Sequence, residues 1–292
     1  MKKNINLSTF TEEIGETKLV TKTITPFPSE DKLQDVVNLK NISVTFNEGT
    51  DKEYKLFENF DFDIPDFPGE GQFISIMGQS GCGKSQILKL ISGLNKPTSG
   101  EVLIYGKPLD GFIPMVFQQY SSFPWMTVLD NVALPLKLKG IKGDELKSTA
   151  MGFLKVVGLE EHSYKWARQP ELSGGQLQRV SLARSMAGNK QILLLDEATG
   201  ALDIKMKREV QDTLLKIYYE STFDPTIISV THSIEEAVYL SNRIIVLKAN
   251  PCSIYKIIDI KFPGQRTPGI RESNEFIEYT RELENIMNEV CK

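Results

Sequence analysis

The stretch that decides the fold is Gly78-Gln79-Ser80-Gly81-Cys82-Gly83-Lys84-Ser85. It fits the pattern G-x-x-x-x-G-K-[ST] at every constrained position. The apolar run 73–77 precedes it, and a helical apolar pattern that includes Ile91 follows it. This strand–turn–helix context predicts a phosphate-binding loop, because glycines let successive backbone N–H groups converge on phosphate oxygens and the helix N-terminus adds a positive dipole end.

Three side chains of this loop carry separate expectations. Lys84 is expected to bridge the β- and γ-phosphates of a nucleotide, and the Ser85 hydroxyl to ligate Mg²⁺. Cys82 is expected to contribute only its backbone N–H, and we expect a thiol-alkylating reagent to inactivate the protein while ATP protects it. The alternative is a glycine-rich turn that binds nothing, and the flanking strand and helix patterns favour the phosphate loop.

A pair of acids follows a second apolar run. Residues 192–195 lead directly into Asp196 and Glu197. In open α/β sheets the carboxyl ends of the strands are where ligands bind. Asp196 is therefore expected to hold Mg²⁺, through a water, and Glu197 to polarise the water that attacks the γ-phosphate. The alternative is a strand end that turns out to solvent through two acids.

A third motif names a family. A helix that begins at Ser173 offers free backbone N–H groups and a positive dipole end, which suit a γ-phosphate. The stretch Leu172-Ser173-Gly174-Gly175-Gln176 and the helical pattern after it resemble the signature motif of ABC-type ATPases. The other landmarks of that family occur along the chain in the order expected for it. They are a Q-loop glutamine at Gln118, before the signature motif, and after it a D-loop at Gly200-Ala201-Leu202-Asp203 and a switch histidine at His232.

The resemblance implies a site shared by two subunits. In the family the signature helix closes on nucleotide held by a second subunit, so two ATP molecules lie between two copies. Carried over, the implied nucleotide contacts are the phosphate loop, the adenine-stacking Phe46, and Ser173, Gly174, Gly175, Gln176 and Asp203. Tyr54 competes with Phe46 for the adenine. The implied catalytic residues are Glu197, His232 and Gln118, and the implied Mg²⁺ ligands are Ser85, Gln118 and Asp196.

One segment points to a branch of the family. Residues 122–132, SFPWMTVLDNV, resemble the LLPW-TVLDNV stretch of importers in the nitrate/sulfonate/taurine group, and residues 196–203 are similar to its DEPFGALD. Ala198-Thr199 replaces the group's Pro-Phe, which puts the solute in doubt more than the ATPase. Pro124 and Trp125 are expected to contact the permease; the alternative is a hydrophobic anchor within the helical region.

The order of elements predicts an α/β fold, a P-loop ABC cassette with a mostly parallel core sheet, a small antiparallel β subdomain and a helical insert. Strands are expected at 72–77, 101–105, 115–117, 191–195, 226–230 and 243–247. Residues 127–188 read as mostly helical, and 271–291 as an amphipathic helix. The expected organisation is a polar extension at 1–37, an ATPase domain at 38–265 with its insert at about 119–188, and a C-terminal helical segment at 266–292.

The composition argues against several classes of partner and binding site. The formal net charge of −4, from 34 Lys+Arg against 38 Asp+Glu, argues against a general nucleic-acid binder. Cys82, Cys252 and Cys291 form no CxxC pair, which argues against a zinc site or a disulfide framework and fits a reducing cytosol. Since no apolar run is long enough to span a bilayer, the expected location is the cytoplasmic face of a membrane. The expected partners are a second copy, permease subunits and a substrate-binding protein.

Two other function classes compete with transport. A cytosolic ABC ATPase unrelated to transport would carry either long coiled coils between its ATP motifs or two cassettes, and this chain has one cassette and no heptad run between Ser85 and Leu172. A regulatory module that binds nucleotide without turnover is disfavoured by Glu197, Gln118 and His232. The second histidine, His162, is expected to have no catalytic role.

Overall fold

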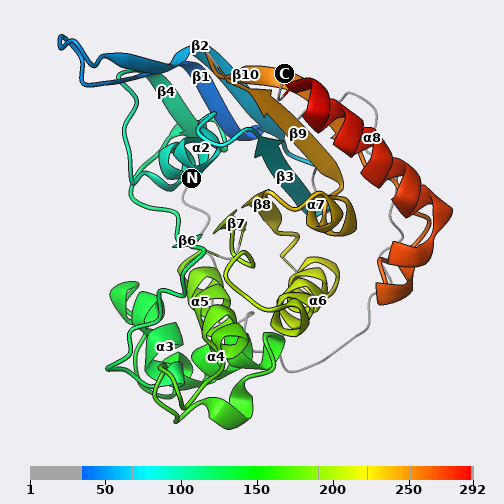
Figure 1. Ribbon diagram of the computed structural model, residues 1–292. Helices are drawn as coiled ribbons and strands as arrows, with labels where there is room; N and C mark the ends of the chain where they lie inside the picture. Colours follow the sequence, from blue (N-terminus) through cyan, green and yellow to red (C-terminus); the bar gives the residue numbers. More distant parts are fainter. Residues whose placement is uncertain (1–34, 68, 190, 222, 250, 291–292) are drawn as a thin grey trace. The chain divides into compact units, whose positions relative to one another are not determined.

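The computed structural model describes residues 35–67, 69–189, 191–221, 223–249 and 251–290 (Figure 1). The predicted extension at 1–37 therefore lies outside the described residues except for 35–37, which begin the first strand. The chain divides into two compact units. Of the described residues, those within 35–115, 194–197 and 226–290 form one unit, called here the sheet unit; those within 116–193 and 198–225 form the other, the helical unit.

The sheet unit contains a small antiparallel sheet. Its strands are β1 (Asp35–Phe46), β2 (Tyr54–Pro65), β4 (Ser99–Ile104) and β5 (Lys107–Pro108), in the order β2-β1-β4-β5. In β2 the buried Phe60, Phe62 and Ile64 alternate with exposed residues, which is the pattern of a sheet with one covered face. The predicted antiparallel subdomain is confirmed.

The strand predicted at 101–105 belongs to the antiparallel sheet. Residues 101–105 were expected among the strands that alternate with helices, but β4 pairs antiparallel with β1. Leu103 is its one buried residue, Val102 and Ile104 are half-buried, and the positions 99–101 are exposed. A strand covered on one face suits an antiparallel sheet, whereas parallel strands are usually buried on both faces.

The second sheet carries the phosphate loop. It consists of β3 (Gln72–Gly78), β6 (Met115–Val116), β7 (Ile192–Asp196), β8 (Thr226–Val230), β9 (Arg243–Lys248) and β10 (Ser253–Asp259), in the order β10-β9-β3-β8-β7-β6. β3 runs parallel to both β8 and β9, and every residue of β3 and β8 is buried. The apolar runs thus mark fully covered parallel strands, as predicted. The antiparallel edge strand β10 was not predicted, because most of its residues are not buried and give no apolar run.

The helices of the sheet unit are α2 (Lys84–Ser92), α7 (Ile234–Leu240) and α8 (Asn274–Val290), with a 3-10 turn η2 (Pro268–Glu272). The expected amphipathic helix at 271–291 begins at 274, because η2 precedes it and the Ser273 hydroxyl accepts from the N–H of Phe276 at 3.2 Å. α8 lies beside α7 and β9 (Figure 1) and buries Phe276, Leu283 and Ile286.

The helical unit contains α3 (Val128–Leu138), α4 (Gly143–Val156), the 3-10 turn η1 (Glu160–His162), α5 (Gly174–Gly188) and α6 (Ile204–Glu220). The mostly helical character expected for 127–188 is confirmed. Thr127, Ser173 and Asp203 cap α3, α5 and α6 with their side chains, which satisfies orphan N–H groups of each first turn. Across the described ranges, no helix combines the length and apolarity needed to cross a membrane.

Candidate functional site: a nucleotide cradle and a signature helix

The loop between β3 and α2 is built so that glycine is required at its two ends. At Gly78, with φ +150°, a Cβ would lie 2.5 Å from the Leu247 carbonyl oxygen and 2.9 Å from Cys82 Sγ. At Gly83, with φ +102°, a Cβ would lie 2.8 Å from the Phe57 ring. No side chain fits in either place, so the loop backbone can curve closely around a ligand.

Lys84 is folded into this loop. It is 5% exposed, and its Nζ donates to the carbonyl oxygens of Gly78 at 2.9 Å and Gln79 at 2.7 Å. A buried ammonium group has to be paired, and here two backbone dipoles of the loop pair it. The loop therefore combines N–H donors with a positive charge, which is what a phosphate chain requires.

The Ser85 hydroxyl meets the end of β7. Its Oγ donates to Asp196 Oδ1 at 2.8 Å, although the two residues are far apart in sequence. A hydroxyl oxygen and a carboxylate oxygen side by side are the hard donors that Mg²⁺ prefers. The residues present thus fit that ion.

Glu197 and His232 form the second polar pair of the sheet unit. His232 Nε2 lies 2.9 Å from Glu197 Oε1, and both side chains keep access to solvent. The Glu197 backbone has φ +49°, a left-handed conformation that is uncommon for a residue with a side chain. Its N–H donates to the Val230 carbonyl at 2.9 Å, which anchors the turn after β7 to the end of β8. Strain of this kind concentrates at functional sites.

Phe46 and Tyr54 are direct cross-strand partners at the turn end of the β1–β2 hairpin, next to the connecting loop. Their exposed fractions are 42% and 44%. The structure therefore places the two candidate residues for adenine stacking side by side.

Cys82 corrects the expectation of thiol sensitivity. Its side chain is completely buried, and burial raises the pKa of its thiol, only partly offset by the nearby Lys84 charge. The thiolate is the reactive species. The raised pKa keeps the thiolate fraction small, and burial keeps reagents away from the sulfur. Rapid inactivation by an alkylating reagent is therefore not expected of the folded protein.

We instead expect Cys82 to react with N-ethylmaleimide at least about tenfold more slowly in the native protein than in urea-denatured protein, because alkylation of a buried thiol requires local opening. Raising the pH should accelerate the native reaction, since a raised pKa leaves more thiol to deprotonate. Peptide mass spectrometry at several times measures the labelling. Equal native and denatured rates would contradict the burial. Cys252 is an internal comparison, because it too is buried and burial raises its pKa to about 12.

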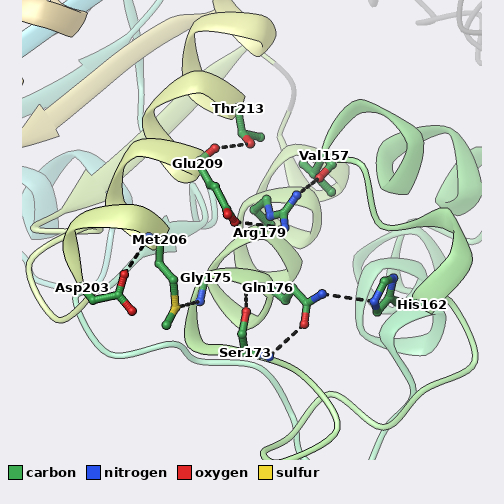
Figure 2. A network of polar contacts seen from close by, with 10 residues as sticks. All are labelled: Val157, His162, Ser173, Gly175, Gln176, Arg179, Asp203, Met206, Glu209 and Thr213. Atoms are coloured by element: carbon green, nitrogen blue, oxygen red, sulfur yellow. Dashed lines mark hydrogen bonds and ion pairs between the residues drawn. The ribbon is translucent and has the colours of Figure 1, made fainter. Parts of the chain in front are cut away.

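In the helical unit the tip of α5 is closed by two reciprocal hydrogen bonds (Figure 2). Ser173 Oγ accepts from the Gln176 N–H at 3.2 Å, and Gln176 Oε1 accepts from the Ser173 N–H at 2.8 Å. This capping box fixes the first turn of the signature helix. It leaves the N–H of Gly174 among the donors without an intrahelical partner.

The side of this tip packs on α6. A Cβ on Gly175 would lie 3.1 Å from Met206 Cβ, and the Gly175 N–H donates to Met206 Sδ at 3.2 Å (Figure 2). Asp203 caps α6 by accepting from the Met206 N–H at 2.9 Å. The second signature glycine thus has a packing role, and the D-loop aspartate has a capping role.

Gln118 lies in an exposed bend after β6. Two buried or half-buried residues of α5 organise the segment around it: Gln178 Nε2 donates to the Phe117 carbonyl at 2.9 Å, and the Arg184 guanidinium donates to Ser121 Oγ and its carbonyl at 2.8 Å. Sequence reasoning missed both residues. The available signal was the long polar side chain of Gln178 among the buried residues of α5.

The sequence-predicted residues thus fall into two groups. The sheet unit brings together the phosphate loop, Asp196, Glu197 and His232, and it also contains Phe46. The helical unit holds the signature residues, Asp203 and Gln118. A parallel sheet whose central strand ends in a phosphate loop, with an acid pair at the end of another strand, defines a P-loop nucleotide-binding protein.

The comparisons give the family. Residues 57–200 match the sequence profile described as "ABC transporter". An uncharacterized ABC transporter ATP-binding protein of Methanocaldococcus jannaschii is 40% identical over 90% of this chain and 95% of its own length. The nitrate import ATP-binding protein NrtD of Synechocystis is 42% identical over 74% of this chain and 84% of its own length. The aliphatic sulfonates import ATP-binding protein SsuB of Bacillus cereus is 36% identical over 85% of this chain and 94% of its own length.

A solved structure is similar to this chain in both fold and sequence. The ATP-binding cassette MJ0796, in a dimeric post-hydrolysis state bound to ADP and Pi, matches with a TM-score of 0.64 and 36% identity over 77% of this chain and 99% of that one. The chain belongs to the ABC transporter family, as an ATP-binding subunit with ATPase activity.

Proposed function

We propose that this protein is the ATP-hydrolysing subunit of an ABC importer, which works as a pair and drives solute uptake through a separate permease. The observation that carries the hydrolytic part is the Glu197–His232 pair at 2.9 Å in the same unit as the phosphate loop and the Ser85–Asp196 pair. A carboxylate that is oriented by a histidine and lies beside a triphosphate site has what water activation needs.

In this proposal the cradle binds the phosphates of ATP, and Lys84 turns from the loop carbonyls towards the β- and γ-phosphates. Ser85, Asp196 and Gln118 would hold Mg²⁺, which when bound neutralises phosphate charge. Glu197 accepts a proton from the attacking water. His232 holds the Glu197 carboxylate in place and contacts the γ-phosphate. Phe46 or Tyr54 stacks on the adenine.

The second half of each site comes from another copy of the chain. Ser173, Gly174, Gly175 and Gln176 form a helix tip, and a positive helix end is a natural anion site. With Asp203 they would close on ATP held by the partner copy. The similarity to a cassette solved as a dimer with ADP and Pi supports this arrangement.

The transport role is supported by the relatives. Two of them are named for import of nitrate and of aliphatic sulfonates. We infer a location at the cytoplasmic face of a membrane, a permease partner and a substrate-binding protein, with nitrate, sulfonate or taurine-like solutes as the first candidates. The alternative is a cytosolic ABC ATPase without a permease. Co-purification with a multi-span permease, followed by reconstitution of the two and ATP-dependent uptake into proteoliposomes, would decide for transport; failure to associate with any permease would favour the cytosolic ATPase.

Trp125 is the proposed permease contact. Its exposed fraction is 69%, and its ring lies 5.4 Å from that of Phe123, whose own face is covered by the Arg184 guanidinium at 4.6 Å. An exposed aromatic side chain on an ordered base is a typical interface anchor.

We expect Trp125→Ala to leave phosphate release by the isolated subunit within about twofold, because the ring supports no buried core, and to lower permease-coupled uptake about tenfold or more, as loss of a central anchor does. Parallel assays of the free subunit and of proteoliposomes measure both. Tyr164→Ala, which removes another ring with an exposed fraction of 69%, is the matched control. Unimpaired uptake by the Trp125→Ala variant would show that this ring makes no contact that permease-coupled transport needs.

A further inference from the structure

We propose that His162 is a positioning residue of the signature motif. It fixes the side-chain amide of Gln176, and through that amide it holds the backbone of Ser173 at the tip of α5. The inference rests on the proposed function, in which this tip closes on ATP held by a second copy.

The orientation of the Gln176 amide follows from its two contacts (Figure 2). Oε1 accepts from the Ser173 N–H at 2.8 Å, so Nε2 is left to face His162, and it lies 3.1 Å from His162 Nε2. An amide nitrogen can only donate. His162 Nε2 must therefore be the acceptor in this pair.

That requirement fixes the state of the ring. With Nε2 as acceptor, His162 is neutral and carries its proton on Nδ1. Nδ1 is buried and finds no hydrogen-bond partner among the described residues. A buried polar atom without a partner costs stability, and an apolar side chain at this position would avoid that cost. Packing alone therefore does not account for an imidazole here, whereas the contact with Gln176 does.

The contact selects one of two amide orientations. The terminal torsion of glutamine is broad and roughly two-fold, so a rotated amide would present its NH₂ group to the Ser173 N–H. Donor would then face donor, and the capping box would be lost. By accepting from Nε2, His162 favours the orientation that keeps the box closed.

The tip is thus held from two sides. His162, on η1, acts through Gln176, and Met206, on α6, contacts the Gly175 N–H at 3.2 Å (Figure 2). Between these two contacts lie the backbone groups that the proposed function aims at the γ-phosphate. Preorganised donors cost no rearrangement when the ligand arrives, so loosening one side should weaken closure rather than nucleotide binding to the cradle.

The test compares two substitutions in the full chain. His162→Leu removes the acceptor, whereas His162→Gln keeps an oxygen acceptor near the position of Nε2. Glu161→Leu, on the same turn and exposed, is the matched control. Thermal unfolding verifies that each variant is folded.

Two measurements are made on each variant. Hydrogen–deuterium exchange of residues 173–176 without nucleotide reports the tip itself. The dissociation constant of the ATP-bound dimer, measured by analytical ultracentrifugation in a Glu197→Gln background, reports closure. We expect His162→Leu to speed exchange at the tip and to weaken the dimer about five- to tenfold, the size of one lost hydrogen bond. His162→Gln should restore both quantities to within about twofold, with ATP affinity of the monomer unchanged in all three variants.

Equal effects of His162→Leu and His162→Gln would overturn the proposal, because packing alone would then explain the residue. Wild-type exchange and dimerisation in His162→Leu would also overturn it. If His162→Leu does not fold, a double-mutant cycle of His162→Ala with Gln176→Met takes its place, and additive effects on tip exchange would contradict the coupling. If the Glu197→Gln parent does not dimerise with ATP, the proposed function has failed, and exchange at 173–176 still decides the role of His162.

Discussion

Replacing Glu197 by glutamine is expected to lower steady-state phosphate release about 10²- to 10⁴-fold, the usual contribution of a general base. The amide keeps the shape of the carboxylate and can still contact His232, which lies 2.9 Å away in the parent. The side chain is not part of the phosphate loop, so ATP should still bind. Because hydrolysis is what would release the paired state, the variant should accumulate as an ATP-bound dimer. Size-exclusion chromatography with and without ATP measures the dimer, and phosphate release measures turnover.

Glu235→Gln is the matched control, since Glu235 is an exposed acid on α7 in the same unit. It should hydrolyse ATP at the parent rate and show no ATP-dependent dimer beyond the parent's. A Glu197→Gln protein with undiminished turnover would remove Glu197 from the mechanism. A Glu197→Gln protein that is inactive yet stays monomeric at saturating ATP would instead contradict the shared site.

The sequence predicted best those features that depend on a short stretch of residues. The glycine pattern at 78–85 predicted a loop in which glycine proves necessary for steric reasons, at Gly78 and Gly83. The apolar runs at 72–77 and 226–230 predicted strands because both faces of these strands are covered. In each case a local pattern was sufficient, since the constraint itself is local.

Other features depend on contacts that no local pattern encodes. β10 is an edge strand with few buried residues, so it gave no hydrophobic signal. The sequence predicts that an alkylating reagent reaches Cys82, but its side chain is completely buried in the fold. The sequence predicts no catalytic role for His162, and only the fold places its ring against Gln176. The left-handed conformation of Glu197 likewise occurs in a turn that is hydrogen-bonded to Val230, a residue of another strand.

The C-terminal helix also could be predicted as an element but not placed. Its apolar spacing was visible in the sequence, whereas the hydrogen bond from Gln79 Nε2 to the Val290 carbonyl at 2.8 Å joins the end of α8 to the phosphate loop. An ion pair and a hydrogen bond from β10 hold the same helix, through Lys256 with Glu282 and Tyr255 with Glu289. Such long-range pairing is a property of the tertiary structure.

Replacing Lys84 by methionine is expected to weaken ATP binding about 10- to 100-fold, the size of a lost charge-assisted contact. Methionine keeps much of the length and apolar stem of lysine but offers neither charge nor donor. AMP lacks the phosphates that Lys84 is proposed to reach, so its affinity should change much less. The variant should therefore lose most of the parent's preference for ATP over AMP. Isothermal titration calorimetry with both nucleotides measures this difference directly.

Lys89→Met separates this effect from a general loss of positive charge, because Lys89 lies on the same helix, in its last turn. It should bind ATP as the parent does. The substitution at Lys84 also leaves the Gly78 and Gln79 carbonyls without their present donor, so a modest drop in melting temperature is expected for that variant alone. If ATP and AMP weakened equally, the loss would come from a distorted loop rather than from a missing phosphate contact. The ammonium group would then be a structural brace of the loop, and the cradle would bind phosphate through its backbone N–H groups alone.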